Sequence, residues 1–153
     1  MTLILGIDPG GTGGHTGAVL LHYLYGDPPS LIDSWAIPGD MDSFREWWQS
    51  EALGYGFDTV VCEMFVNRNK PGADLTPMLF EGAVRYLVPD VVLQPAAGKN
   101  TAVDDTAMSN LGFTKSMFKG DHHGDRFEAL RHVMWYLKKQ RHRPTLLKGW
   151  PRD

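Results

Sequence analysis

Three short apolar segments fill most of the first 38 residues, and the turns between them limit the fold more than any other feature. The segments are Leu3–Ile7, Thr16–Tyr23 and Ser30–Ile37. The first connection holds the Asp8-Pro9-Gly10-Gly11 turn, and the second holds Gly26-Asp27-Pro28-Pro29. Pro presets φ for a turn and Gly accepts a positive φ, so both connections favour tight reversals. Three strands on short connections predict an antiparallel meander.

The hydrophobic period then changes from two to that of a helix. We expect helices over residues 42–53 (capped by Asp42 or Ser43), 75–88, 101–111 and 126–140, and strands within 57–66 and over 91–93. The order β-β-β-α-β-α-β-α-α predicts an α/β fold with a mixed sheet flanked by helices. We assign residues 1–140 to one domain and expect an irregular, basic tail over 141–153.

Length and composition exclude several classes of protein. At 153 residues and 42% hydrophobic content, the chain is expected to form one soluble domain. No apolar run approaches the ~20 residues of a membrane span, so we expect no membrane partner. The first residues lack the pattern of a signal peptide, and the single cysteine, Cys62, cannot form an internal disulfide. These features predict a cytoplasmic protein.

Charge is distributed unevenly along the chain. The formal net charge is −3, but residues 1–98 hold 4 basic and 12 acidic side chains, whereas residues 99–153 hold 11 basic and 6 acidic ones. An asymmetry of this kind is a hint of a polyanionic partner, although a basic C-terminal half is also typical of ordinary solvated surface.

Two predicted strands each carry one carboxylate in an apolar setting. Asp8 ends the first strand, and Glu63 lies in the segment Thr59–Phe65. A buried carboxylate is costly unless it is paired or binds a metal, and adjacent central strands would bring these two together, where they need a cation. Asp8 as a simple turn residue and Glu63 as a strand-end residue facing water remain open alternatives.

The last predicted helix supplies a third group. Asp125, Glu128 and His132 are spaced by three and four residues, so they share one face. Acids near a helix N-terminus also favour the helix dipole, but that explanation does not account for the preceding Asp121-His122-His123-Gly124, which is rich in metal-binding side chains.

Three motifs resemble the RuvC-type Holliday junction resolvases. Residues 4–10 (ILGIDPG) with 16–19 (TGAV) resemble the opening hairpin of that family, residues 60–63 (VVCE) its second acidic strand, and residues 125–132 (DRFEALRH) its final helix. Residues 104–113 (DDTAMSNLGF) also resemble the helix before the last loop. The resemblance covers Leu3 to about Leu137, and the length is similar to that of phage-type members.

The resemblance implies an RNase H-like fold, a homodimer in a bacterial or phage-infected cell, and cleavage of four-way DNA junctions with two Mg²⁺ or Mn²⁺ ions. Asp8 would bridge both ions, Glu63 would hold one, and Asp125 with Glu128 the other. In this family the last metal ligand is usually an aspartate, so a glutamate at position 128 differs from the family pattern. An alternative assignment uses His122 and Asp125 as the last two ligands in place of Asp125 and Glu128. Hard oxygen ligands favour Mg²⁺ or Mn²⁺ over zinc.

DNA contacts are expected mainly from the basic half of the chain. Lys99 occupies a position where the family tends to place a lysine that binds the DNA backbone. The predicted DNA-binding residues are Lys99, Arg68, Lys70, Lys115, Lys119, Arg131 and Lys138. Contacts of this kind to phosphates set affinity and salt dependence.

Three other functions fit parts of the sequence. The residues GIDPGGTGG resemble the opening of actin-like sugar kinases, but 153 residues leave no room for their second domain, and no nucleotide-binding signature is present, so no nucleotide cofactor is expected. The second alternative is a nuclease that acts on flaps, forks or other branched DNA, with the same fold and metal ions as the resolvases but without strict specificity for four-way junctions. A non-catalytic DNA-binding module is disfavoured by the four acids.

Overall fold

The structure is a computed structural model that describes residues 1–10, 13–66, 71–121 and 123–152. A five-stranded sheet in the order β3-β2-β1-β4-β5 forms its centre. β1, β2 and β3 are antiparallel, and β4 and β5 run parallel to β1. The strands are β1 Thr2–Asp8, β2 His15–Tyr23, β3 Ser30–Pro38, β4 Thr59–Met64 and β5 Val92–Pro95. The predicted meander and mixed five-stranded sheet are therefore confirmed.

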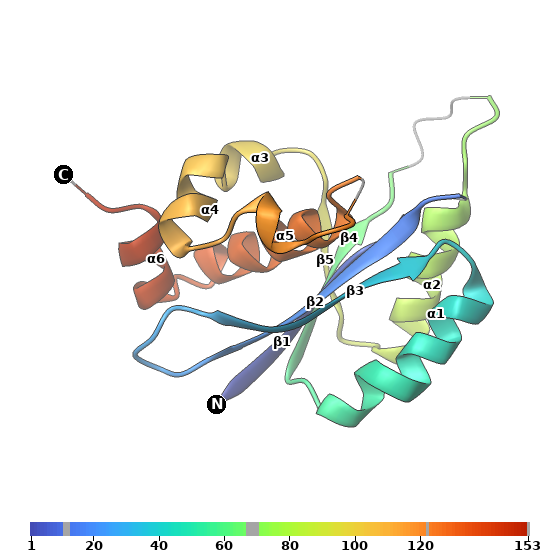
Figure 1. Cartoon of the computed structure of the whole chain (residues 1–153), viewed down its shortest axis with the longest axis horizontal. Helices are drawn as coiled ribbons and strands as arrows, with labels where there is room; N and C mark the ends of the chain where they lie inside the picture. Colours follow the sequence, from blue (N-terminus) through green and yellow to red (C-terminus); the bar gives the residue numbers. More distant parts are fainter. Residues whose placement is uncertain (11–12, 67–70, 122, 153) are drawn as a thin grey trace.

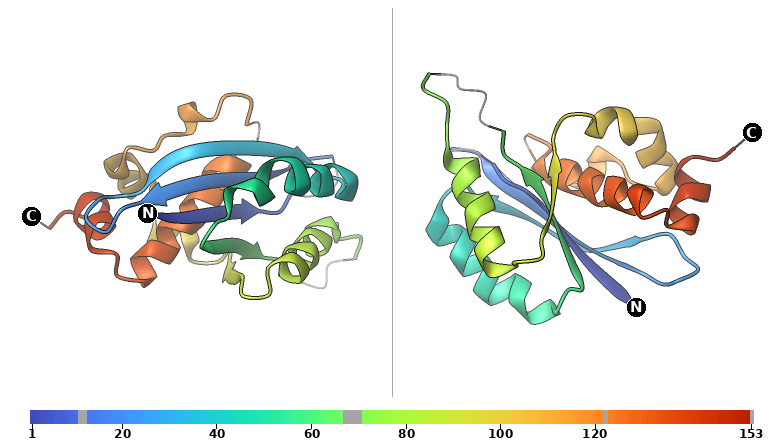
Figure 2. Two further views of the ribbon diagram at one scale, coloured as in Figure 1. Left: turned by 90° about the horizontal axis from the view of Figure 1, so that it is seen from below. Right: turned by 180° about the vertical axis from the view of Figure 1, so that it is seen from behind.

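Helices cover both faces of the sheet. Figures 1 and 2 show α1 and α2 on one face and α3 to α6 on the other. The helices are α1 Met41–Trp47, α2 Thr76–Leu87, α3 Lys99–Ala102, α4 Asp105–Leu111, α5 Asp125–Lys139 and α6 Arg143–Gly149. A π-helical turn Trp48–Ala52 and 3-10 turns Leu53–Tyr55 and Lys115–Met117 complete them. Among the helices of the described residues, none has the length and apolar character needed to cross a bilayer.

The period of two along the strands divides the core into two clusters. Leu5 and Ile7 of β1 pack with aromatic residues of α1 and α2, whereas Ile4 packs with α4 and α5. In β4, Cys62 belongs to the first cluster and Val61 to the second. Because successive side chains point to opposite faces, Asp8 and Glu63 are both on the face that α5 covers.

Two predicted helices differ from the structure in their ends. α1 begins at Met41 because the Asp40 side chain accepts from the Ser43 N–H at 2.8 Å and acts as its cap, in place of the predicted Asp42 or Ser43. The single helix predicted over 101–111 is two helices, α3 and α4, separated at residues 103 and 104. Asp104 begins a new helix because its carboxylate accepts from the Ala107 N–H at 2.8 Å.

The prediction of an irregular tail over 141–153 is wrong for residues 143–149, which form α6. Pro144 lies in the first turn of this helix, where the missing N–H has no cost. The helix packs on α4, since the Gly149 carbonyl accepts from Asn110 at 3.2 Å and Thr145 is fully buried. From the sequence, Pro144 was interpreted as a sign of irregular structure, whereas in the structure it marks the start of a helix.

Candidate active site

Asp8 and Glu63 lie side by side at the ends of two neighbouring parallel strands. Ile7 pairs with Cys62 at the end of the β1–β4 ladder, so the next residue of each strand is one of the two acids. Asp8 is 9% exposed and Glu63 has a side chain 22% exposed. The expectation that adjacent central strands bring these carboxylates together is confirmed.

Two glycines let α5 lie close enough to the sheet to bring its own acids to the same place. A Cβ on Gly6 would lie 2.8 Å from the Ala129 carbonyl oxygen, and one on Gly17 would overlap the backbone carbonyl of Asp125. Gly17 is the β2 partner of Asp8. The first turn of α5 therefore packs directly beside Asp8, which places Asp125 and Glu128 at the same edge of the sheet.

The N-terminus of α5 is held by a side chain from the preceding loop. Asp121 accepts from the backbone N–H of Arg126 at 3.1 Å, so it satisfies a donor that the helix leaves free. This contact fixes where the helix begins and hence where Asp125 lies.

Lys99 is a central member of the site and lies between two of the acids. Its ammonium is 3.0 Å from Glu63 Oε2 and 2.9 Å from Glu128 Oε2, and its side chain is 8% exposed. It is the first residue of α3, after Gly98 in a left-handed conformation. The sequence placed Lys99 in a DNA-facing loop; the structure places it among the carboxylates.

His132 also contacts Glu63, and sequence reasoning did not assign it to the site. Its Nε2 lies 2.7 Å from Glu63 Oε2, and the ring is completely buried. The sequence places His132 on the same face as Glu128, four residues later, but indicates no role for it. Glu63 is thus held by one residue from α3 and one from α5.

The site carries more negative charge than its own lysine neutralises. Burial, followed by the charge of Glu63, raises the pKa of Asp8 well above its ordinary value, and Asp125 and Glu128 add to the effect. Burial and the charge of Asp121 also raise the pKa of Asp125. Burial opposes ionisation of Glu63, but the hydrogen bond from His132 and the charge of Lys99 outweigh it and lower the pKa of Glu63.

These residues fit a divalent cation in charge and in ligand type. The acids offer carboxylate oxygens, the ligands that Mg²⁺ and Mn²⁺ prefer. Burial and the charge of Glu63 raise the pKa of Asp8 although Lys99 opposes them, and a bound cation would further favour its ionised form. As the side chains stand, no three His, Cys, Asp or Glu residues among those described converge on one point. Lys99 instead takes the space between Glu63 and Glu128, so a metal ion bound between these two acids would displace the Lys99 ammonium.

Comparisons with known proteins identify the fold. No protein-family profile matches the sequence, and no curated protein matches it. Among solved structures, Thermus thermophilus RuvC in complex with a Holliday junction substrate matches at 15% identity and a TM-score of 0.63, over 91% of this chain and 96% of that chain. The fowlpox virus Holliday junction resolvase matches at 13% identity and a TM-score of 0.60, over 91% and 99%. The chain has the fold of these resolvases. The predicted RNase H-like architecture is thereby confirmed.

Within this resolvase fold, only some of the predicted DNA-binding residues are free to meet a ligand. Lys115 and Lys119 are exposed on the loop before α5. Lys138 donates to the Ala102 carbonyl at 2.6 Å and lies 4.2 Å from the centre of the Trp150 ring, so its charge is already used within the fold. Arg68 and Lys70, like the alternative ligand His122, lie outside the described residues.

Arg131 was predicted to contact DNA, but the structure places its side chain inside the fold. The side chain is 3% exposed and donates to the Val103 carbonyl at 2.5 Å and to Asp105 at 2.6 Å. It also lies 3.3 Å from Glu128 Oε1. Arg131 therefore ties α5 to the start of α4 and holds Glu128 from the side opposite Lys99.

We expect Arg131→Met to lower the free energy of unfolding by about 2–4 kcal/mol, because the buried Val103 carbonyl and the partly buried Glu128 carboxylate lose their donor. A thermal or denaturant melt measures this loss. The salt dependence of DNA binding should keep its wild-type slope, whereas loss of a true phosphate contact would reduce that slope by about one. A reduced slope with unchanged stability would restore Arg131 to the DNA-binding set.

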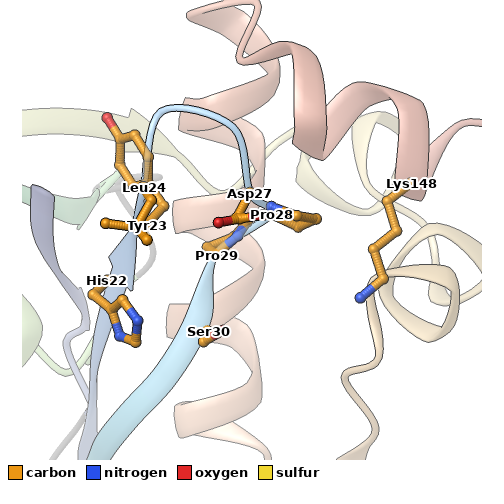
Figure 3. Close-up of a pocket in the computed structure, with 8 residues that line it drawn as sticks. All are labelled: His22, Tyr23, Leu24, Asp27, Pro28, Pro29, Ser30 and Lys148. Carbon is orange, nitrogen blue, oxygen red and sulfur yellow. The ribbon is translucent and has the colours of Figure 1, made fainter. Parts of the chain in front are cut away.

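One surface hollow of the fold lies away from these residues. It has a volume of about 320 Å³ between the β2–β3 turn and α6, and Figure 3 shows Lys148 on one side of it and Asp27 on the other. None of the four acids, Lys99 or His132 lines it. A second surface hollow, of about 420 Å³, reaches the candidate active site, because Glu128 lines it together with Lys115 and Arg131.

Proposed function

We propose that the chain is a divalent-metal-dependent endonuclease that resolves four-way DNA junctions. The observation that supports this best is the meeting of Asp8, Glu63, Asp125 and Glu128 at one edge of a sheet with the resolvase fold. The neighbours of similar fold are themselves junction resolvases, two of them in complex with junction DNA. Lys115 and Lys119 are exposed on the segment before α5 and supply positive charge for a DNA backbone.

The proposed reaction assigns each side chain a distinct task. Asp8 would bridge two Mg²⁺ or Mn²⁺ ions, with Glu63 on one and Asp125 and Glu128 on the other. Two such ions supply an activated water and stabilise the leaving oxygen of an in-line phosphodiester displacement. Lys99, released from Glu63 and Glu128 when cations bind those acids, would then be free to pair with a phosphate of the substrate.

The function is tested by a panel of four-way junction, flap, fork and linear duplex, each incubated with Mg²⁺, with Mn²⁺ or with EDTA. We expect paired cuts in the four-way junction with either metal and no cutting with EDTA. Equal cleavage of all four substrates would replace junction resolution with a general nuclease acting on branched or linear DNA. Cutting in EDTA would exclude the two-metal assignment.

The outer face of α2 supports a homodimer, which paired cuts in a symmetric junction require. Leu75, Met78, Leu79 and Tyr86 are each about half exposed or more. Positions 75, 79, 82 and 86 alternate in steps of four and three, the spacing of a helix–helix seam. In an antiparallel pair of α2 helices, Leu79 of one copy would face Gly82 of the other, a large side chain against a small one.

The apolar character of this α2 face also favours a second copy as its occupant. Its four exposed apolar side chains lie on one helix, and a contiguous apolar patch of this kind on a monomer marks an interaction surface. The opposite side of α2 is already occupied, since Phe80 and Val84 are fully buried against the sheet.

We expect Leu79→Glu to convert the protein to a monomer, because each dimer would then bury two unpaired carboxylates. Light scattering measures the mass, and the cleavage assay should show single nicks in place of paired cuts. Leu147→Glu is the matched control, because Leu147 is a 63% exposed leucine on α6. A monomeric wild-type chain, with and without DNA, would reject the dimer.

A further inference from the structure

His132 is buried beside the candidate active site and contacts one of its acids. Its ring has no exposed surface, and its Nε2 lies 2.7 Å from Glu63 Oε2. No other described histidine is fully buried. Packing alone does not explain a fully buried imidazole in contact with an acid of this site. An aliphatic side chain would fill the same space on α5 and would leave no buried polar group without a partner.

The hydrogen-bonding pattern defines the state of this ring. A carboxylate can only accept, so Nε2 carries the hydrogen and donates it to Glu63. The other ring nitrogen, Nδ1, is buried and has no partner among the described residues. A hydrogen on Nδ1 would therefore be buried without an acceptor, which favours the neutral ring with its single hydrogen on Nε2.

The backbone that carries the ring is also fixed. The His132 carbonyl accepts from Gln94 Nε2 at 2.8 Å, so this turn of α5 is tied to β5. The Gln94 side-chain oxygen in turn accepts from Lys139 at 3.2 Å. The Nε2–H donor thus points at Glu63 from a position determined by two elements of the fold.

Glu63 uses only one of its two oxygens in these contacts. Both His132 and Lys99 bond to Oε2, and no described residue bonds to Oε1. Lys99 has a long, flexible side chain and a second carboxylate to pair with, whereas His132 has a short, rigid one. His132 is therefore the contact that fixes the rotation of the carboxylate and leaves Oε1 as the oxygen available to a cation.

We propose that His132 is a positioning residue, which holds the Glu63 carboxylate so that Oε1 is presented to a divalent ion. This inference rests on the proposed function, because it assigns Glu63 to a metal site. Residues that hydrogen-bond to metal ligands commonly change metal affinity or activity by 10–100-fold when they are replaced. We expect an effect of that size here, on metal binding first.

The experiment compares His132→Leu and His132→Gln in the full-length chain. Calorimetry with Mn²⁺ alone measures metal affinity without DNA, and cleavage rates across Mg²⁺ concentrations measure the metal requirement. His132→Leu should weaken Mn²⁺ binding about 10–100-fold and raise the Mg²⁺ needed for half-maximal cleavage similarly, with a smaller change in rate at saturating Mg²⁺. His132→Gln should recover part of the loss, since its amide can donate from about the position of Nε2.

Thr145→Val is the matched control for loss of a buried hydrogen bond. Thr145 is fully buried on α6 and bonds to His142 at 2.7 Å, outside the site. Its variant should bind Mn²⁺ as the wild type does, even if its melting temperature falls. Wild-type Mn²⁺ affinity in a folded His132→Leu protein, or equal losses in the Leu and Gln variants, would overturn the positioning role. A wild-type chain that neither binds Mn²⁺ nor cuts DNA would instead overturn the proposed function itself.

Discussion

Replacing Asp8 with asparagine is expected to abolish metal-dependent cleavage while making the metal-free protein more stable. Two ions share Asp8 in the proposed site, and a metal contributes several kcal/mol to stabilising the transition state. Loss of about 4 kcal/mol corresponds to a rate about 1000-fold lower. Asparagine keeps the shape of the side chain, so binding of a four-way junction should change little. Cleavage and gel-shift assays on the same protein preparation measure the two effects.

The gain in stability follows from the sign of the pKa shift. Burial and the charge of Glu63 raise the pKa of Asp8 in the folded state above its ordinary value of 3.8. The folded protein therefore binds this proton more tightly than the unfolded chain does. The stability from Asp8 is fully present below pH 3.8 and is lost as the pH rises through the raised pKa. At neutral pH part of this stability has been lost, and asparagine, which cannot ionise, avoids that loss.

A thermal melt at pH 7 in EDTA should show Asp8→Asn melting above the wild type, by about 2–4 °C for each kcal/mol relieved in a chain of this size. Added Mg²⁺ should raise the melting temperature of the wild type and leave that of the variant nearly unchanged. Asp42→Asn is the control, because Asp42 is an exposed acid on α1 whose salt bridge with Arg45 lies at the surface. Equal Mg²⁺ stabilisation of Asp8→Asn and wild type would remove Asp8 from the metal site.

Part of the arrangement of the four acids could be predicted because it follows from short-range rules. Alternation along a strand places Asp8 on one face with Gly6, and a spacing of three places Asp125 and Glu128 on one side of a helix. The formal net charge of −3 is a poor guide to whether the partner is a polyanion. The four acids alone contribute −4 to the sum, and they lie together at one site. The division into an acidic and a basic half is the more useful description of the sequence.

The contacts that hold those acids could not be predicted in the same way. Lys99 reaches Glu63 and Glu128 through the packing of α3 against α5, over sequence separations that leave no local pattern. His132 and Arg131 lie about one helical turn from Glu128, but their contacts with Glu63 and Val103 depend on how α5 packs in the fold. A basic residue in a basic half of the chain was interpreted as a DNA contact, and only the fold shows that Arg131 is buried. The break between α3 and α4 depends on Asp104 accepting from Ala107, which competes with a continuous helix in a way that hydrophobic periodicity does not record.

Gly17→Ala is expected to impair cleavage about 100-fold although residue 17 has no reactive group. Its Cβ would overlap the backbone carbonyl of Asp125, so α5 must move away from the sheet by about 1 Å to accept it. Displacements of that size can lower a catalytic rate about 100-fold, and here they separate Asp125 and Glu128 from Asp8. We also expect a loss of about 1–3 kcal/mol in stability, the usual cost of overpacking.

Gly26→Ala is the matched control, because Gly26 lies in the β2–β3 turn and a Cβ there meets nothing within 4 Å. Cleavage should be measured well below the melting temperature of each variant, so that unfolding does not account for the loss. Added Mn²⁺ at high concentration should restore only part of the Gly17→Ala rate, since the ligands themselves have moved apart. A folded Gly17→Ala protein with wild-type cleavage would show that the close packing of α5 against β2 does not determine the geometry of the site.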